Sequence, residues 1–198
     1  MKIKANGIDI EVEDTGGTGP VVVLIMGLGM QLVAWPLQLV DALVAAGYRV
    51  IRHDNRDIGL SQKFDDKGVP NLVWESIKLK FGITPRAPYS LKDMALDTVG
   101  VLDALGVAQA HIVGASMGGM IAQRVALAAP GRTLSLISIM STSGAKGLPN
   151  PKAKVIRALM ARPKGQDREA TLKHSVHLLR LIGRPAFPPS ESLMPERN

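Results

Sequence analysis

The sequence contains no cysteine, few aromatic residues and no long apolar run. Without cysteine, the chain forms no disulfide and holds no metal ion through thiolates. No run approaches the roughly 20 apolar residues that a membrane-spanning helix needs, and the first residues lack the apolar core of a secretion signal. We therefore expect a cytoplasmic protein with no membrane partner.

Acidic residues are scarce at one end of the chain. Residues 1–145 hold 13 basic residues (lysine and arginine) and 13 acidic residues, so their charges balance. Residues 146–198 hold 11 basic and 4 acidic residues, which accounts for the whole net charge of +7. A basic segment can bind nucleic acid or acidic lipid. Because these basic residues are not interleaved with stacking aromatic residues, a solvated surface is the favoured interpretation, and we expect no nucleic-acid partner.

The order of predicted elements indicates an α/β fold. Asn6 and Gly7 suit the turn of a β-hairpin. The run 21–26 is apolar at every position, which is typical of a strand buried on both faces. Strands and helices then alternate to residue 140. This order predicts a hairpin followed by a mostly parallel sheet with helices on both faces.

The pattern changes near residue 145. We assign residues 1–145 to the α/β core, and residues 146–198 to a helical cap segment that ends in a proline-rich, unstructured tail. Helices are expected at 152–162 and 167–182. No strand is expected after residue 140, so the apolar strand 134–140 would be an open sheet edge. We expect the chain to self-associate through that edge.

One motif suggests nucleophilic chemistry. The sequence GASMG, residues 114–118, fits the pattern G-x-S-x-G and lies between a predicted strand and a predicted helix. In that context a sharp turn exposes the serine, which makes Ser116 the candidate nucleophile. The N–H of Met117, at the helix start, would stabilise an oxyanion formed by attack on a carbonyl. The alternative is a glycine-rich packing turn with an incidental serine.

A second glycine-rich segment could supply another donor. The sequence MGLGM, residues 26–30, follows the apolar strand directly. Its two glycines leave the backbone free to turn an N–H group into a cleft. We expect the N–H of Leu28 to be the second oxyanion donor. An ordinary glycine-rich strand exit is the alternative.

Two longer blocks around these motifs carry a family resemblance. Residues 21–66 (VVVLIMGLGM to SQKFDD) and 101–144 (VLDALGVAQA to STSG) closely resemble the N-terminal half of α/β-hydrolase-fold serine hydrolases. The nearest group is the esterase-like branch that includes polyketide methylesterases of the aclacinomycin type. The resemblance implies Ser116 as nucleophile, Leu28 and Met117 as oxyanion donors, and a reaction that needs neither cofactor nor metal.

The activating partners of Ser116 are harder to find. In this family an acid and then a histidine follow the nucleophile, but the segment 141–147 contains no carboxylate. His53 and His111 are expected to be structural. His174 and His177 share a face of a predicted helix, but no third metal ligand is in view. Either could hang over the cleft, but a catalytic base must also reach the serine oxygen and be held by an acid. We therefore expect the triad aspartate and histidine, and the final strands, to be missing from this chain.

Two functional hypotheses follow. The first is a serine hydrolase that acts on a small-molecule carboxylic ester through an acyl-enzyme at Ser116. The second is a catalytically incomplete, truncated paralogue that is non-catalytic or binds a partner. In either case, the cap and the loop 62–89 are expected to shape the pocket.

Overall fold

The computed structural model describes residues 1–68, 87–145, 147–148, 152–161 and 168–182. Most of the expected pocket loop at 62–89, and all of the expected unstructured tail at 184–198, lie outside these residues. The chain divides into two compact units, Met1–Ser143 and Gly144–Asn198. None of the described helices combines the length and the apolar character needed to cross a bilayer.

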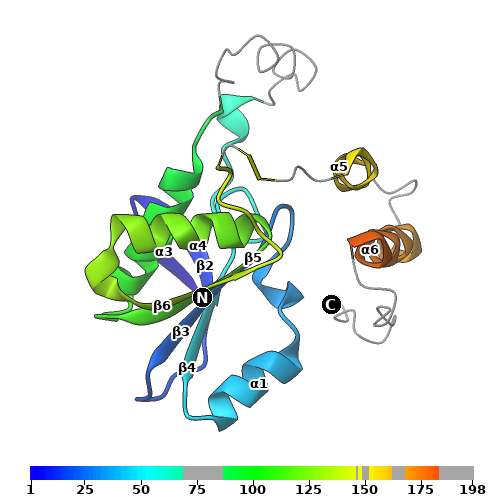
Figure 1. Ribbon diagram of the computed structural model, residues 1–198. Coiled ribbons are helices and arrows are strands. Elements are labelled where there is room, and N and C mark those ends of the chain that lie inside the picture. Colours follow the sequence, from blue (N-terminus) through cyan, green and yellow to red (C-terminus); the bar gives the residue numbers. More distant parts are fainter. Residues whose placement is uncertain (69–86, 146, 149–151, 162–167, 183–198) are drawn as a thin grey trace. The chain divides into compact units, whose positions relative to one another are not determined.

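A six-stranded sheet forms the centre of the first unit (Figure 1). Its strand order is β1-β2-β4-β3-β5-β6. The pairs β1–β2 and β2–β4 are antiparallel, and the remaining pairs are parallel. The strands are β1 (Lys2–Ala5), β2 (Ile8–Asp14), β3 (Val21–Ile25), β4 (Arg49–His53), β5 (Ala110–Ala115) and β6 (Thr133–Ile139).

The predicted N-terminal hairpin is confirmed. Asn6 and Gly7 join β1 to β2 with φ values of 50° and 79°, the two positive angles that this kind of hairpin turn requires. Along β2, Ile8, Ile10 and Val12 are buried, while the acidic residues between them are more exposed. The alternation of apolar and acidic residues therefore fixes which face of β2 packs inward.

Helices cover both faces of the sheet, as predicted (Figure 1). The helix α1 (Leu37–Ala45) lies on one face, and α3 (Leu91–Ala104) and α4 (Met117–Ala128) lie on the other. Every residue of β3 is buried. Val21, Val23 and Ile25 pack with α3 and α4, whereas Val22 and Leu24 pack on the α1 side. An apolar residue at each position of β3 follows from this two-sided burial.

Local capping explains where α3 begins. Ser90 accepts a hydrogen bond from the N–H of Asp93, and the Asp93 carboxylate accepts from the N–H of Ser90, which completes a capping box. These hydrogen bonds from Ser90 hold the pKa of the Asp93 carboxyl below its usual value. The paired polar groups at 90 and 93 therefore fix the start of this helix.

The strand β6 forms one edge of the sheet. It pairs with β5 in parallel, and no described strand pairs with its other side. β6 contains no charged residue or proline, and its four large apolar residues are exposed, namely Leu134, Leu136, Ile137 and Ile139. Such an edge offers unpaired backbone groups together with apolar side chains.

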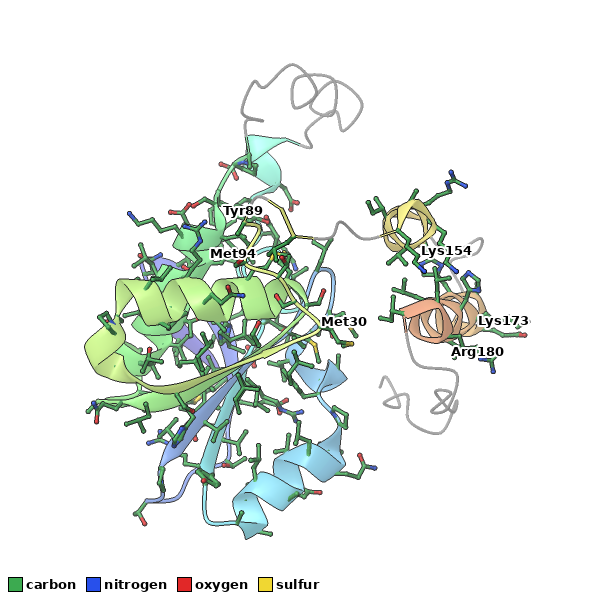
Figure 2. The ribbon with its side chains drawn as sticks, in the orientation of Figure 1. Met30, Tyr89, Met94, Lys154, Lys173 and Arg180 are labelled. Atoms are coloured by element: carbon green, nitrogen blue, oxygen red, sulfur yellow. The ribbon has the colours of Figure 1, made fainter. Side chains whose placement is uncertain are left out.

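The second unit contains two helices that pack against each other, α5 (Ala153–Met160) and α6 (Arg168–Ile182). They match the helices expected at 152–162 and 167–182 to within two residues. Val176 is buried, while the cationic side chains Lys154, Lys173 and Arg180 are exposed (Figure 2). Lys173 pairs with Glu169 one turn earlier on α6. The basic side chains that the structure describes in this unit are thus exposed to solvent.

Candidate active site

Ser116 lies in a sharp turn between β5 and α4. Its φ of 55° and ψ of −121° are rare for a residue with a side chain, and such strain is often found at functional sites. The residue is exposed. Its N–H donates to the carbonyl oxygen of Ile139, the last residue of β6, at 2.8 Å. The turn is therefore fixed by its backbone and leaves the hydroxyl accessible.

Two glycines allow the backbone to turn this sharply. A Cβ on Gly114 would overlap the carbonyl group of Gly118, and a Cβ on Gly118 would overlap the carbonyl oxygen of Ile25. The end of β5, the start of α4 and the end of β3 therefore meet with no room for side chains. This close approach accounts for the glycines on both sides of Ser116.

The segment that follows β3 lies beside Ser116. A Cβ on Gly27 would lie 3.0 Å from the Cβ of Ser116 and 3.5 Å from its Oγ. Gly27 begins a four-residue turn, in which the N–H of Met30 donates to the Gly27 carbonyl at 3.3 Å. Gly29 has a φ of 70°, which the third position of such a turn commonly requires. Leu28 therefore lies on a tight turn next to the serine.

The backbone N–H groups of Leu28 and Met117 are both available. Neither donates a hydrogen bond to any other residue that the structure describes. Met117 is the first residue of α4, so its N–H lies at the positive end of the helix dipole. Two free N–H groups near one exposed hydroxyl are the elements of an oxyanion hole.

The histidines of the first unit lie away from Ser116 or are enclosed. His53, on β4, is buried, and its Nε2 lies 3.1 Å from the Oγ1 of Thr98. Burial lowers the pKa of His53, and the charges of Asp97 and Asp54 only partly oppose that effect. His111 lies five residues before Ser116 on β5, about 16 Å along a strand. Its Nδ1 pairs with the Oγ of Ser135 at 2.8 Å.

The other two histidines lie on α6 of the second unit. Within the described residues, no three histidine, cysteine, aspartate or glutamate side chains gather closely enough to hold a metal ion. The structure thus brings Ser116, Leu28 and Met117 together, and within the described part of the first unit it places no imidazole beside them.

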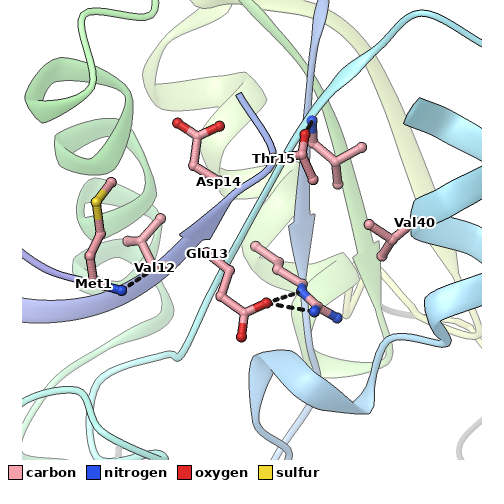
Figure 3. A pocket seen from close by; sticks show the side chains of 8 residues that line it. Met1, Val12, Glu13, Asp14, Thr15 and Val40 are labelled. Atoms are coloured by element: carbon pink, nitrogen blue, oxygen red, sulfur yellow. Dashed lines mark hydrogen bonds and ion pairs between the residues drawn. The ribbon is translucent and has the colours of Figure 1, made fainter. Parts of the chain in front are cut away.

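A hollow of about 370 Å³ opens elsewhere on the first unit (Figure 3). Its walls include Val12, Val40 and Val50, together with charged residues that are already paired. Arg52 donates to the carboxylate of Glu13 at 2.5 and 2.9 Å, and Arg49 donates to Asp14. No residue of the serine turn lines this hollow, so it is separate from the candidate site.

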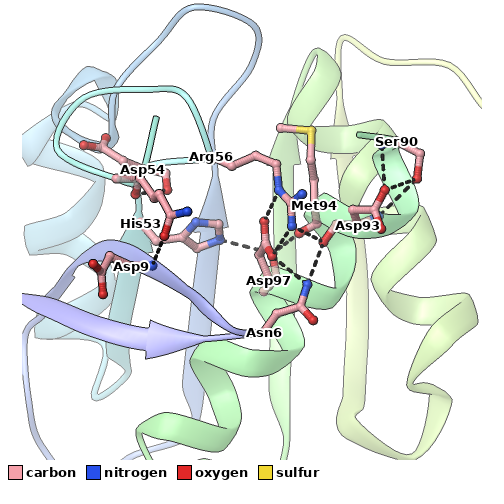
Figure 4. Close-up of polar contacts among 12 residues, drawn as sticks. Asn6, Asp9, His53, Asp54, Arg56, Ser90, Asp93, Met94 and Asp97 are labelled. Atoms are coloured by element: carbon pink, nitrogen blue, oxygen red, sulfur yellow. Dashed lines mark hydrogen bonds and ion pairs between the residues drawn. The ribbon is translucent and has the colours of Figure 1, made fainter. Parts of the chain in front are cut away.

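The loop after β4 is held by a buried ion pair (Figure 4). Arg56 donates to both carboxylate oxygens of Asp97, on α3, at 2.6 and 2.7 Å, and the Asn6 side chain donates to the same carboxylate. Burial alone would lower the pKa of Arg56, but the hydrogen bonds and charge of Asp97 outweigh it and raise the pKa. The guanidinium carbon of Arg56 also lies 5.2 Å from the centre of the Tyr89 ring.

Two residues that the sequence had not singled out adjoin the candidate site. Asp54 and Asn55 follow β4 directly, and both make hydrogen bonds to the segment after β3. Their position in the sequence could have indicated them. Polar residues that follow a buried parallel strand lie at the edge of the sheet where such folds bind ligands.

Comparison with known proteins decides the family. Residues 20–188 match the family described as alpha/beta hydrolase fold. The chain belongs to this family. Among solved structures, the chain resembles the enol-lactonase of Burkholderia xenovorans LB400, with 28% sequence identity and a TM-score of 0.59. The matched region covers 91% of this chain and 59% of the lactonase.

Two curated relatives of this alpha/beta hydrolase are methylesterases, so the expected resemblance to the esterase-like branch is confirmed. Rhodomycin D methylesterase DauP of Streptomyces sp. (strain C5) is 32% identical over 184 residues, which cover 83% of this chain and 55% of the relative. Rhodomycin D methylesterase DnrP of Streptomyces peucetius is 39% identical over 113 residues, which cover 57% of this chain and 32% of the relative. The chain spans about half the length of the first and a third of the second.

Proposed function

We propose that this alpha/beta hydrolase is a serine hydrolase that cleaves a small-molecule carboxylic ester through an acyl-enzyme on Ser116. The observation that carries the proposal is the strained, exposed serine at the end of β5, beside two N–H groups with no partner among the described residues. The methylesterase relatives support an ester as the substrate class.

The chemistry assigns one role to each residue. The Ser116 Oγ attacks the ester carbonyl and gives its proton to a base, and the carbonyl oxygen becomes negative. The N–H groups of Leu28 and Met117 stabilise that charge; removal of a single donor of this kind typically slows a reaction by about 100- to 1000-fold. The alcohol then leaves, and water releases the acid from Ser116.

Within the described part of the first unit, no histidine is placed to act as the base. His53 is enclosed in the core and His111 lies at the far end of β5, so neither reaches the Ser116 hydroxyl. A base must lie within hydrogen-bond distance of the proton that it removes. The competing function, a non-catalytic paralogue that binds a partner, draws support from the same observation.

Active-site labelling separates the two functions. The purified chain is treated with a fluorophosphonate probe and with a short-chain nitrophenyl ester, beside Ser116→Ala and the matched control Ser138→Ala on β6. Because no described base lies beside Ser116, we expect slow but measurable labelling and turnover in the wild type and in Ser138→Ala, and neither in Ser116→Ala. Equal signals in all three proteins would remove Ser116 from the mechanism. An unlabelled wild type would favour the non-catalytic alternative.

A further inference from the structure

Two consecutive residues hold the two ends of the turn that carries Leu28. The Nδ2 of Asn55 donates to the carbonyl of Met26 at 2.9 Å, just before the turn. The Oδ1 of Asp54 accepts from the N–H of Leu32 at 2.7 Å, just after it. The five residues 27–31 therefore run between two fixed points.

The geometry of the sheet makes both hydrogen bonds possible. The strands β3 and β4 are parallel neighbours, and Ile25 is in register with His53. The residues that follow each strand consequently leave the sheet side by side. Asp54 and Asn55 are 3% and 2% exposed, so their hydrogen bonds are shielded from competing water.

The direction of the Leu28 N–H depends on this turn. The peptide between Gly27 and Leu28 is trans and planar, so its C=O and its N–H point in opposite directions. The Gly27 carbonyl accepts from Met30 within the turn, which directs the Leu28 N–H away from the turn. A shift at either end of residues 27–31 would rotate that peptide.

Asp54 is itself held on its other side. Its Oδ2 accepts from the N–H of Leu60 at 2.9 Å, and its backbone carbonyl accepts from the Ser61 hydroxyl at 2.7 Å. A Cβ on Gly59 would overlap the same Oδ2. The carboxylate therefore fills the space between the turn after β3 and the loop 54–61.

Asn55 has an unusual feature for a residue with a purely structural role. Its Oδ1 is buried and has no hydrogen-bond partner within the described part of the chain. An unpaired buried oxygen lowers stability, whereas an apolar residue of similar shape would avoid that loss. Buried polar atoms without a hydrogen-bond partner are expected mainly near functional sites.

From these contacts we infer that Asp54 and Asn55 are positioning residues that direct the Leu28 N–H toward the oxyanion formed at Ser116. The inference rests on the proposed function, because it assigns the N–H of Leu28 its role there. Neither side chain touches the substrate. Each acts on the transition state through the backbone between Met26 and Leu32.

Isosteric substitutions test the inference with little change in packing. In Asn55→Asp the side chain keeps its size and loses its donor to Met26. In Asp54→Asn one of the two N–H groups, on Leu32 or Leu60, loses its acceptor. Thr98→Val is the matched control, because it removes a buried hydroxyl whose described hydrogen bonds go to His53 and Met94 and not to the turn.

The first measurement is the rate constant for fluorophosphonate labelling of Ser116, with kcat and KM for a nitrophenyl ester. We expect Asn55→Asp and Asp54→Asn to lower the labelling rate and kcat by at least about 10-fold, up to the loss typical of deleting a donor. KM should change by less than about 3-fold, because the N–H acts mainly in the transition state. Thr98→Val should keep the wild-type rates.

The second measurement is amide hydrogen exchange at Met30 and Leu32, which needs no reaction at Ser116. We expect both amides to exchange at least about 10-fold faster in Asn55→Asp and Asp54→Asn than in Thr98→Val. Unchanged exchange in both variants, or an equal rise in Thr98→Val, would overturn the inference. If exchange rises as expected while the wild type never labels, the positioning contacts stand and the proposed hydrolase function fails.

Discussion

A methyl group on Gly27 would lie 3.0 Å from the Cβ of Ser116 and 3.1 Å from the carbonyl oxygen of Ala115. These distances are shorter than ordinary van der Waals contact. The turn after β3 and the serine turn are thus packed so closely that no further atom fits between them at position 27. Their separation is set by the absence of a side chain at position 27.

Gly27→Ala should therefore push the two turns apart and slow the reaction of Ser116. We expect the fluorophosphonate labelling rate to fall by about 10-fold or more, because the Leu28 N–H moves with Gly27 away from the oxyanion position. Gly131→Ala is the control, since a Cβ there meets no atom within 4 Å. Wild-type labelling in Gly27→Ala would show that the turns do not act together.

The buried pair between Arg56 and Asp97 predicts a large effect on stability. Asp97→Asn keeps the shape of the side chain but leaves the Arg56 guanidinium, whose side chain is 8% exposed, without its counter-charge. We expect the free energy of unfolding in urea to fall by about 3 to 5 kcal/mol. The exposed pair between Arg132 and Asp103 provides the comparison, and Asp103→Asn should cost less than about 1 kcal/mol. Similar losses in both variants would contradict this reading.

The enclosed imidazole of His53 predicts a dependence of stability on pH. Burial lowers its pKa in the folded state, so at mildly acidic pH the unfolded chain binds a proton that the folded chain does not. The contribution of the neutral His53 to the free energy of unfolding is therefore complete above the ordinary pKa of 6.5. It is lost as the pH falls from 6.5 toward the lower pKa of the folded state. The loss is at most about 1.4 kcal/mol per pH unit.

Urea unfolding at several pH values between 7.5 and 5 measures this effect. We expect the free energy of unfolding to decrease more steeply with falling pH in the wild type than in His53→Gln, which cannot take up that proton. Thr98→Val, which keeps the imidazole, is the control and should retain the steep decrease. Parallel curves for the wild type and His53→Gln would rule out His53 as the source.

The open edge of β6 predicts assembly. We expect a second copy of the chain to pair with β6, because no described strand pairs with its outer side and it has exposed apolar residues and no charge that would oppose pairing. Light scattering should detect a species larger than the monomer. Ile137→Lys should restore the monomer, while Leu127→Lys, at an exposed apolar position on α4, should not. A wild type that stays monomeric over a wide concentration range would disprove this expectation.

Much of the fold was predictable because its signals are local. The unbroken apolar run of β3 requires two covered faces, and Asn6 and Gly7 require a turn with two positive φ angles. The capping residues Ser90 and Asp93 likewise act within one helical turn. In each case the physical cause lies within a few residues, so the sequence contains it.

The candidate site was predictable only in part. The glycines at 114 and 118 indicated the strained turn at Ser116. The contacts of Asp54 and Asn55 with Met26 and Leu32 join residues more than 20 positions apart. They depend on the parallel register of β3 and β4, which the sequence does not specify residue by residue. The same holds for the ion pair of Arg56, which reaches across 41 residues to α3.

The N–H of Ser116 donates to the carbonyl of Ile139, so a hydrogen bond links the candidate nucleophile to the edge strand β6. The turn that carries Ser116 is held by the outermost strand, so we expect a molecule that pairs with that strand to shift the turn. Reactivity at position 116 should then vary with protein concentration. Substitutions made on β6 to improve solubility should therefore be checked for their effect on the labelling of Ser116.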